Sequence, residues 1–208
     1  MSTKTQVVEE FRCHAICQAA MRVVGRKGLA KATMDDIARE AGVAKGTLYL
    51  YFKSRDAILE KTIGAAVDEL LERLQRAAGG AGSPGTFAET LTRVLTAQFA
   101  YFDEHRDFFR LYFASGEYSE DRRLRQTRRY RLHLDQLVAL IERGRRAGEL
   151  TSDDPERAAI AIAGAVRDLL LRRINEKKPP APESEARLLV ELLFRGLEKR
   201  GKARGRSR

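Results

Sequence analysis

The chain has 208 residues, of which 43% are hydrophobic and 33% are charged, and its formal net charge at pH 7 is +10. This length and apolar content allow one or two domains with a sizeable core. No apolar run approaches the roughly 18 residues that suggest a membrane span, and the N-terminus lacks the apolar stretch of a signal peptide. We therefore expect a cytoplasmic protein that makes no contact with a membrane.

The basic excess lies at the two ends of the chain. Residues 1–57 carry 10 Lys and Arg against 6 Asp and Glu, whereas residues 58–198 carry 23 of each kind. The final segment, 199–208, holds 6 basic residues and no acidic ones, which favours a disordered tail. A cationic N-terminal surface favours a polyanionic partner such as DNA. Whether the tail also contacts DNA or is merely solvated stays open at this point.

A first helix is predicted from about residue 6 to residue 26, and Gly28 follows it as the stop signal. Its apolar residues recur at helical spacing, as shown by Phe11, Ala15, Ala19 and Val23. The only two cysteines, Cys13 and Cys17, lie four residues apart on this helix. We interpret them as small buried hydrophobic residues rather than as a redox switch.

The stretch from residue 33 to residue 55 predicts a helix, a sharp turn and a second short helix. Thr33 is an N-cap residue type, and Asp36 three positions later forms a weaker version of the capping box. Gly42 provides the left-handed residue at which the chain turns, and Ala38 is small where the two helices would cross. The residues that remain on the outer face combine a cation, a hydroxyl and aromatic tips, which suit phosphates and base edges; they are Lys45, Gly46, Thr47, Tyr49, Leu50 and Tyr51.

About residues 10–60 resemble the DNA-binding domain of the TetR (tetracycline repressor) family of transcriptional regulators. The resemblance rests on Ala19-Ala20, Gly28-Leu29, Asp36-Ile37-Ala38, Ala41-Gly42-Val43, Lys45-Gly46-Thr47-Leu48-Tyr49 and Tyr51-Phe52-Lys53-Ser54-Arg55. Three positions differ from the family pattern: Ala44 stands where a capping Ser is frequent, Tyr51 stands where His is usual, and Arg55 stands where Lys is usual. With the capping positions and the flanking basic residues included, the candidate DNA contacts are Thr33, Ala44, Lys45, Gly46, Thr47, Tyr49, Leu50, Tyr51, Lys53 and Arg55.

The rest of the chain predicts further helices and no strand, so we expect an all-α protein of about nine helices. Helices are predicted over about 56–78, 86–103, 105–116, 121–147, 154–178 and 184–199. Thr86 with Glu89 forms a second capping box, and Asp154-Pro155 provides a cap with proline at the first helical position. The expected organisation is a DNA-binding domain at 1–55, a helical effector-binding and dimerisation domain at 56–199, and a basic tail at 200–208.

The resemblance implies a repressor that binds a pseudopalindromic operator in double-stranded DNA as a homodimer and releases it when an effector binds. The aromatic residues of the middle helices suggest an apolar or aromatic effector, although a core alone would also account for them. The candidate ligand contacts are Phe99, Phe102, Phe108, Phe109, Tyr112, Phe113, Tyr130 and Leu134. The last two helices carry a surplus apolar face that favours a four-helix dimer contact, with Ala161, Gly164, Leu188 and Leu192 at or near it.

Two other classes of protein were weighed against this interpretation. An enzyme is not favoured, because the three histidines lack metal-ligand spacing and neither a nucleophile elbow nor a phosphate-binding glycine loop is present. We therefore expect no catalytic residue, no metal site and no cofactor. A helical protein-protein interaction module without specific DNA binding is the remaining alternative, and a DNA mobility-shift assay would distinguish the two.

Overall fold

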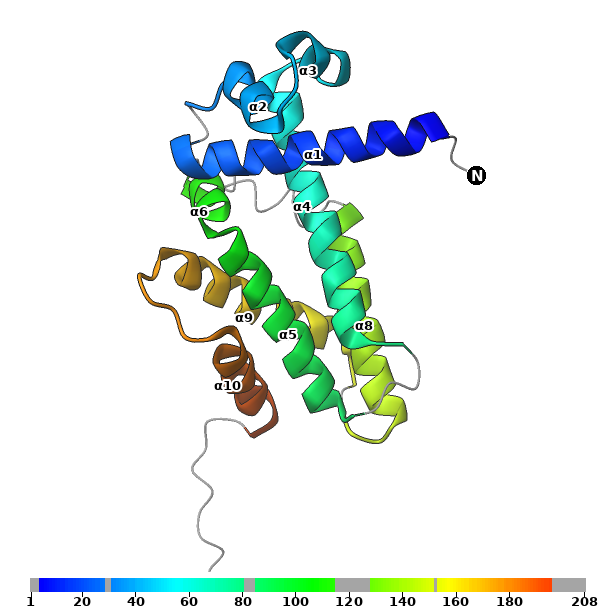
Figure 1. Ribbon diagram of the computed structural model, residues 1–208. Helices are drawn as coiled ribbons and strands as arrows, with labels where there is room; N and C mark the ends of the chain where they lie inside the picture. Colours follow the sequence, from blue (N-terminus) through cyan, green and yellow to red (C-terminus); the bar gives the residue numbers. More distant parts are fainter. Residues whose placement is uncertain (1–3, 29–30, 81–84, 115–127, 152, 196–208) are drawn as a thin grey trace, which may run out of the picture.

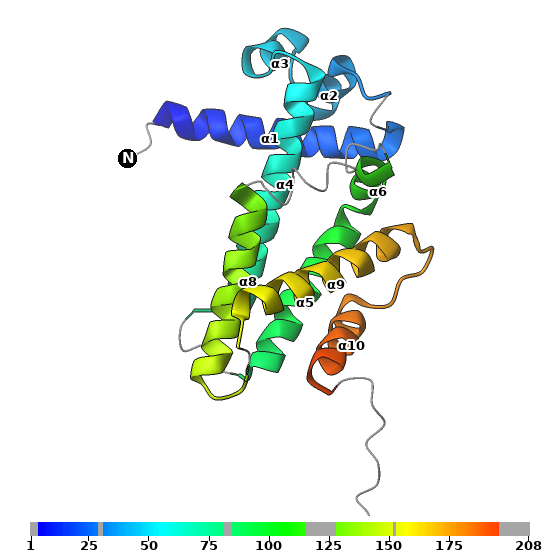
Figure 2. The ribbon, with the colours of Figure 1, turned by 180° about the vertical axis from the view of Figure 1, so that it is seen from behind.

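The computed structural model describes residues 4–28, 31–80, 85–114, 128–151 and 153–195. These residues form nine helices and no strand (Figures 1 and 2), which confirms the all-α prediction. None of these helices is both long enough and apolar enough to cross a membrane. The predicted basic tail lies outside the described residues.

Three helices form the N-terminal unit, and one long helix connects it to the remainder. The unit consists of α1 (Lys4–Lys27), α2 (Met34–Ala41) and α3 (Lys45–Tyr51), and α4 (Arg55–Ala78) leads away from it (Figure 1). The remaining helices are α5 (Phe87–Glu104), α6 (Arg106–Ala114), α8 (Arg128–Arg146), α9 (Pro155–Asn175) and α10 (Pro182–Arg195). α4 packs against α1 at one end and against α5 and α8 further along, and one continuous apolar core includes residues of both parts.

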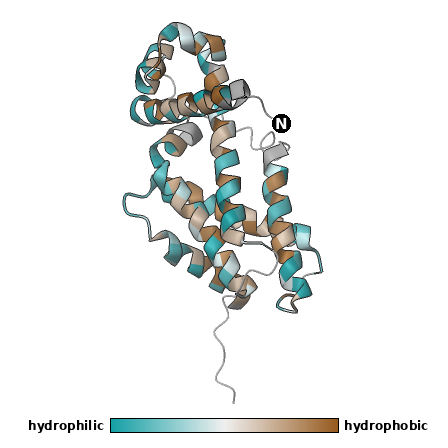
Figure 3. Cartoon of the chain, turned by 45° about the vertical axis from the view of Figure 1, so that its right-hand side comes forward, coloured by the Kyte–Doolittle hydropathy of each residue, from teal (hydrophilic) through white to brown (hydrophobic). Residues whose placement is uncertain are grey.

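Local signals in the sequence determine where several helices begin. The Thr86 hydroxyl accepts the Glu89 backbone N–H at 3.2 Å, and the Glu89 carboxylate accepts the Thr86 N–H at 2.9 Å, so the predicted capping box is confirmed. The Asp154 carboxylate likewise accepts the Arg157 N–H at 3.0 Å, with Pro155 as the first helical residue. Hydrophobic and hydrophilic residues alternate along the helices (Figure 3), as expected of amphipathic helices that share a core.

The predicted apolar face of the first helix is wrong in its N-terminal half. Ala19 and Val23 are buried as expected, but Ala15 is exposed and Phe11 is 74% exposed. The reason is that this half of α1 extends past α4 and away from the other helices (Figures 1 and 2). Helical spacing identifies a face, but only a packing partner buries it.

The ends of the last two helices also differ from the prediction. α9 ends at Asn175 rather than at about residue 178, and α10 begins at Pro182 rather than at Ser184. Pro182 therefore opens a helix instead of only breaking one, because the fixed φ of proline suits the first helical turn, where no N–H partner is needed. The predicted end of this helix, at about residue 199, and the predicted start of the 121–147 helix lie outside the described residues.

A buried ion-pair cluster joins α5, α9 and α10. The Arg173 guanidinium, which is 1% exposed, donates to Asp103 at 2.9 and 2.6 Å and to Glu185 at 2.5 Å. Arg106 donates to the same Asp103 carboxylate at 3.1 Å and to the Glu176 carbonyl at 2.7 Å. Burial alone would raise the pKa of Asp103, but the hydrogen bonds from Arg173 and Arg106 outweigh it and hold that pKa below its usual range. The cluster fixes how α9 and α10 sit on α5.

Candidate DNA-binding surface and effector cavity

The start of α2 is fixed by a complete capping box. The Thr33 hydroxyl accepts the Asp36 N–H at 3.2 Å, and the Asp36 carboxylate accepts both the Thr33 N–H at 3.3 Å and its hydroxyl at 2.8 Å. Lys27 reaches the same carboxylate at 2.6 Å, and its hydrogen bond, followed by that of Thr33, lowers the pKa of Asp36 to about 2. Asp36 therefore remains charged at neutral pH and keeps α2 attached to the end of α1.

The turn between α2 and α3 has the geometry of a helix-turn-helix. Gly42 lies in the left-handed region at φ 68°, which a residue with a Cβ adopts at a cost. Ala38 and Leu48 are buried where the two helices meet. Ala44 is the N-cap of α3 and makes no side-chain capping bond, as the sequence predicted.

The outer face of α3 is exposed to solvent. Leu50 is 83% exposed and Tyr49 is 48% exposed, although both are large hydrophobic side chains. A Cβ added at Gly46 would meet nothing within 4 Å, so the helix presents its backbone openly here. An exposed cation, a small residue, a phenol and an aliphatic side chain on one short helix suit a DNA groove, where a leucine can contact a thymine methyl group.

The candidate DNA contacts differ in how far they are exposed. The exposed members are Thr33, Ala44, Lys45, Gly46, Tyr49, Leu50 and Lys53, whereas Thr47, Tyr51 and Arg55 are half-buried. Lys45 forms an exposed ion pair with Asp35 at 2.7 Å, which holds its ammonium group at the α2 edge of the surface. That these residues contact DNA stays a prediction.

Sequence reasoning missed one cation beside this surface. The Arg12 guanidinium on α1 donates to the Tyr51 hydroxyl at 3.4 Å. The two residues are 39 positions apart, and nothing in the local pattern of either one signals the contact. Arg12 therefore extends the cationic surface from α3 onto α1.

The long helix α4 follows α3 after a short link, residues 52–54. The Ser54 hydroxyl caps it by accepting the Ala57 N–H at 3.2 Å. Further along, the Glu69 carboxylate accepts from Gln18 of α1 at 3.2 Å, and the Ala66 carbonyl accepts from Tyr101 of α5 at 2.9 Å. A shift of α4 would therefore change its contacts both with the N-terminal unit and with α5.

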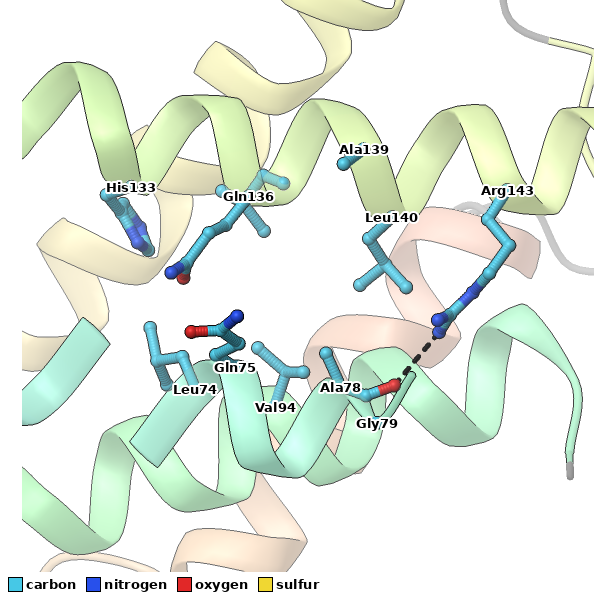
Figure 4. Close-up of a pocket in the computed structure, with 11 residues that line it drawn as sticks. Leu74, Gln75, Ala78, Gly79, Val94, His133, Gln136, Ala139, Leu140 and Arg143 are labelled. Carbon is cyan, nitrogen blue, oxygen red and sulfur yellow. Dashed lines mark hydrogen bonds between the residues drawn. The ribbon is translucent and has the colours of Figure 1, made fainter. Parts of the chain in front are cut away.

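A cavity of about 220 Å³ lies between α4, α5 and α8 at the far end of α4 (Figure 4). It is lined by Leu74, Gln75, Ala78, Gly79, Val94, His133, Gln136, Leu137, Ala139, Leu140 and Arg143. Burial lowers the pKa of His133 to about 4, so this side chain is neutral at pH 7. The Oε1 atom of Gln136 is buried and has no hydrogen-bond partner among the described residues. At the other end, Arg143 donates to the Ala78 carbonyl at 3.0 Å and to the Gly80 carbonyl at 3.3 Å.

The predicted ligand-binding aromatics lie elsewhere in the body. Phe99, Phe102, Phe108 and Phe109 are buried, and the rings of Phe102 and Phe109 stack at 4.1 Å. Leu134 is buried and Tyr130 is half-buried, and the side chains of Tyr112 and Phe113 lie outside the described residues. None of the described members of this set lines the cavity of Figure 4. Their contact with a ligand stays a prediction.

A visible signal could have led to the cavity-lining residues of α8. His133, Gln136, Leu137 and Leu140 follow one another at spacings of three, one and three residues, so they share one helix face. Leu137 and Leu140 are buried, so His133 and Gln136 are polar residues placed on a core-facing stripe. A polar side chain on such a stripe needs a hydrogen-bond partner, so its presence there indicates a possible ligand-binding site.

The predicted dimer residues lie on surfaces of α9 and α10 that no other described part of the chain covers. Leu188 is 54% exposed, Leu192 is 38% exposed and Ala161 is also exposed. A Cβ added at Gly164 would meet nothing within 4 Å. Large apolar side chains gathered on an open face are typical of an interaction surface.

Comparison with protein-family models gives matches over both parts of the chain. Residues 16–62 match the model for bacterial regulatory proteins of the tetR family, and residues 84–171 match that for a tetracyclin repressor-like C-terminal domain. The chain belongs to the TetR family of transcriptional regulators. It is accordingly a DNA-binding regulator rather than an enzyme, and the alternative of a helical interaction module is not favoured.

Relatives in this family cover almost the whole chain. The HTH-type transcriptional regulator BetI of Rhizobium meliloti (strain 1021) is 28% identical over 195 residues, which is 93% of each chain. The crystal structure of the TetR family regulator PfmR from Thermus thermophilus is 27% identical with a TM-score of 0.68, covering 88% of this chain and 99% of PfmR. FadR from Bacillus subtilis, solved in complex with stearoyl-CoA, has a TM-score of 0.73 at 22% identity over 88% of this chain and 98% of FadR, so it supports the fold alone.

Proposed function

We propose that this regulator is a repressor that binds a pseudopalindromic operator as a homodimer and leaves it when a small effector enters the cavity. The observation that carries this proposal is the course of α4, which follows α3 after the short link of residues 52–54 and ends at the cavity wall. A helix of 24 residues is about 36 Å long and moves as a rod. A change in the cavity wall that shifts α4 therefore also displaces α3, the helix proposed to contact the DNA bases.

In this proposal the two halves of the chain have separate tasks. Residues 1–55 read the DNA, and residues 56–199 bind the effector and the second subunit. Two recognition helices match successive major grooves when they are about 34–36 Å apart, or a multiple of that distance. An effector that binds the DNA-incompetent arrangement about 100-fold better supplies about 2.7 kcal/mol, which reverses a preference of about 10:1 for the DNA-competent arrangement. The dimer acts in the cytoplasm.

Selection from a pool of random duplexes tests the DNA-binding part of the proposal. The purified protein should enrich a sequence with two inverted half-sites, and its affinity for the selected duplex should fall steeply as salt is raised, since cationic contacts release counterions. Fluorescence anisotropy with the selected duplex and a scrambled one measures both effects. Enrichment of no common sequence, or equal affinity for both duplexes, would contradict the assignment.

The proposed dimer contact is tested by Gly164→Arg. Because the face around Gly164 is open within one chain, the variant should fold, but a second subunit would have to bury the new charge without a partner. We expect a monomer in sedimentation experiments and an operator affinity at least about 100-fold lower, because the linked second half-site is lost. Ala147→Arg, at an exposed position just after α8, is the matched control and should remain a dimer. A dimeric Gly164→Arg variant with normal operator affinity would place the interface elsewhere.

A further inference from the structure

The cavity between α4, α5 and α8 has the features of a site for one class of small molecule. We propose that the effector is an uncharged, largely apolar molecule with one hydroxyl or N–H group that donates a hydrogen bond to Gln136 Oε1. This inference rests on the proposed function, since it names the chemistry of the molecule that the regulator senses.

The orientation of the Gln136 amide is fixed by its other end. Its Nε2 donates to the Leu71 carbonyl at 3.4 Å, so the amide nitrogen faces α4 and the oxygen is left without a donor among the described residues. With the amide reversed, two carbonyl oxygens would face each other. A buried acceptor without a partner destabilises the protein, and a ligand donor that meets it removes this cost. Because Gln136 Oε1 has no donor among the described residues, the cavity should prefer a ligand that carries a hydrogen-bond donor.

The surroundings of Gln136 disfavour an anionic ligand group at this end of the cavity. His133, which lies one turn before Gln136 and points into the same gap in Figure 4, is neutral at pH 7. The cation of the cavity, Arg143, is seven residues further along α8, about 10 Å away, and it donates to two carbonyls at the end of α4. A carboxylate beside Gln136 would be desolvated next to another acceptor and without a counter-charge, which is costly.

The size and the walls of the cavity describe the rest of the molecule. Leu74, Val94, Leu137 and Leu140 give it an apolar lining, and its volume of about 220 Å³ lies below the roughly 300–1,000 Å³ of sites for drug-sized ligands. A single ring or a short aliphatic chain suits this space. An acyl-CoA such as the stearoyl-CoA bound by FadR is far larger than the cavity.

Three probes that differ in one group test the inference: benzyl alcohol, benzoate and toluene. Calorimetry on the DNA-free protein should show that benzyl alcohol binds at least 10-fold more tightly than benzoate or toluene. In Gln136→Leu, which replaces the acceptor by an apolar group of similar size, toluene should bind more tightly than benzyl alcohol. Gln18→Leu makes the same chemical change at a glutamine of α1 that does not line the cavity, and it should keep the wild-type preference.

Each contrary result has a distinct meaning. Tighter binding of benzoate, an unchanged preference in Gln136→Leu, or no binding of any probe up to its solubility would overturn the inferred effector class. Operator release is followed separately by anisotropy with the same probes. Binding with the expected preference but without release would contradict the proposed switch and leave the chemistry of the cavity intact.

Discussion

Replacing Lys45 and Tyr49 together by alanine should lower the affinity for the selected operator by about 1,000-fold or more, to the level of non-specific DNA binding. Tyr49 is a large side chain that stays half-exposed on α3, and Lys45 presents an ammonium group at the start of the same helix. Neither side chain is needed for the core, so the loss should fall on DNA recognition. Anisotropy titration with operator and scrambled duplexes measures it.

The fold of this double variant should be unchanged. The ion pair that is lost, between Lys45 and Asp35, is exposed on both sides, and alanine is a good helix former. Circular dichroism and sedimentation should therefore match the wild type. Lys177→Ala with Lys178→Ala removes two exposed cations between α9 and α10, away from α3, and serves as the control. Operator affinity within threefold of wild type in the Lys45 and Tyr49 variant would show that α3 does not read the DNA.

The parts of the fold that the sequence predicted well are those determined by neighbouring residues. Thr33 with Asp36, and Thr86 with Glu89, satisfy backbone groups only three positions away, so the pattern and the observed bonds coincide. Gly42 has the left-handed φ that the turn requires. The outer face of α3 was predictable in part, because in a helix of 7 residues the buried Leu48 determines which side is left outside. Lys45, Gly46, Tyr49 and Leu50 are exposed as predicted, whereas Thr47 and Tyr51 are half-buried.

The parts that failed depend on which helices meet. Phe11 and Ala15 have the spacing of a buried face, but no described helix of the chain covers that end of α1. Arg12 and Tyr51 come together only after α1 and α3 are packed in the unit. The cavity likewise arises from the separation of α4 and α8. A sequence pattern predicts which face of a helix is buried, but it does not predict how far that helix lies from its neighbour.

Aromatic residues were an unreliable guide to the cavity for a physical reason. Phe102 and Phe109 fill space by stacking on each other, and neither ring lines this cavity. The cavity occurs instead where Leu137 and Leu140 alternate with His133 and Gln136, and the Gln136 oxygen lacks a partner among the described residues. Polar groups on a core-facing stripe therefore indicated the cavity better than ring content did.

Arg173→Ala should lower the free energy of unfolding by about 3–5 kcal/mol, because it leaves the buried Glu185 carboxylate without its counter-charge and leaves Asp103 with Arg106 alone. Since the total stability of a domain is about 5–15 kcal/mol, this loss is a large part of it. The pKa of Asp103 is held below its usual range, so its contribution is present above the unfolded pKa of about 3.9 and is lost as pH falls through the lower folded value. Urea unfolding at pH 7 measures the change.

The neighbouring residue provides a close control for this effect. Arg172 is on the same helix and pairs with Glu176, but its side chain is 75% exposed, so Arg172→Ala should change the stability little. Arg173→Lys keeps the charge and loses the two-pronged contact with Asp103, so it should lose less stability than the alanine variant and remain folded for measurement. Because the cluster positions α9 and α10 on α5, the lysine variant should also dimerise more weakly in sedimentation experiments. An Arg173→Ala protein as stable as Arg172→Ala would show that the three helices are held by apolar packing alone.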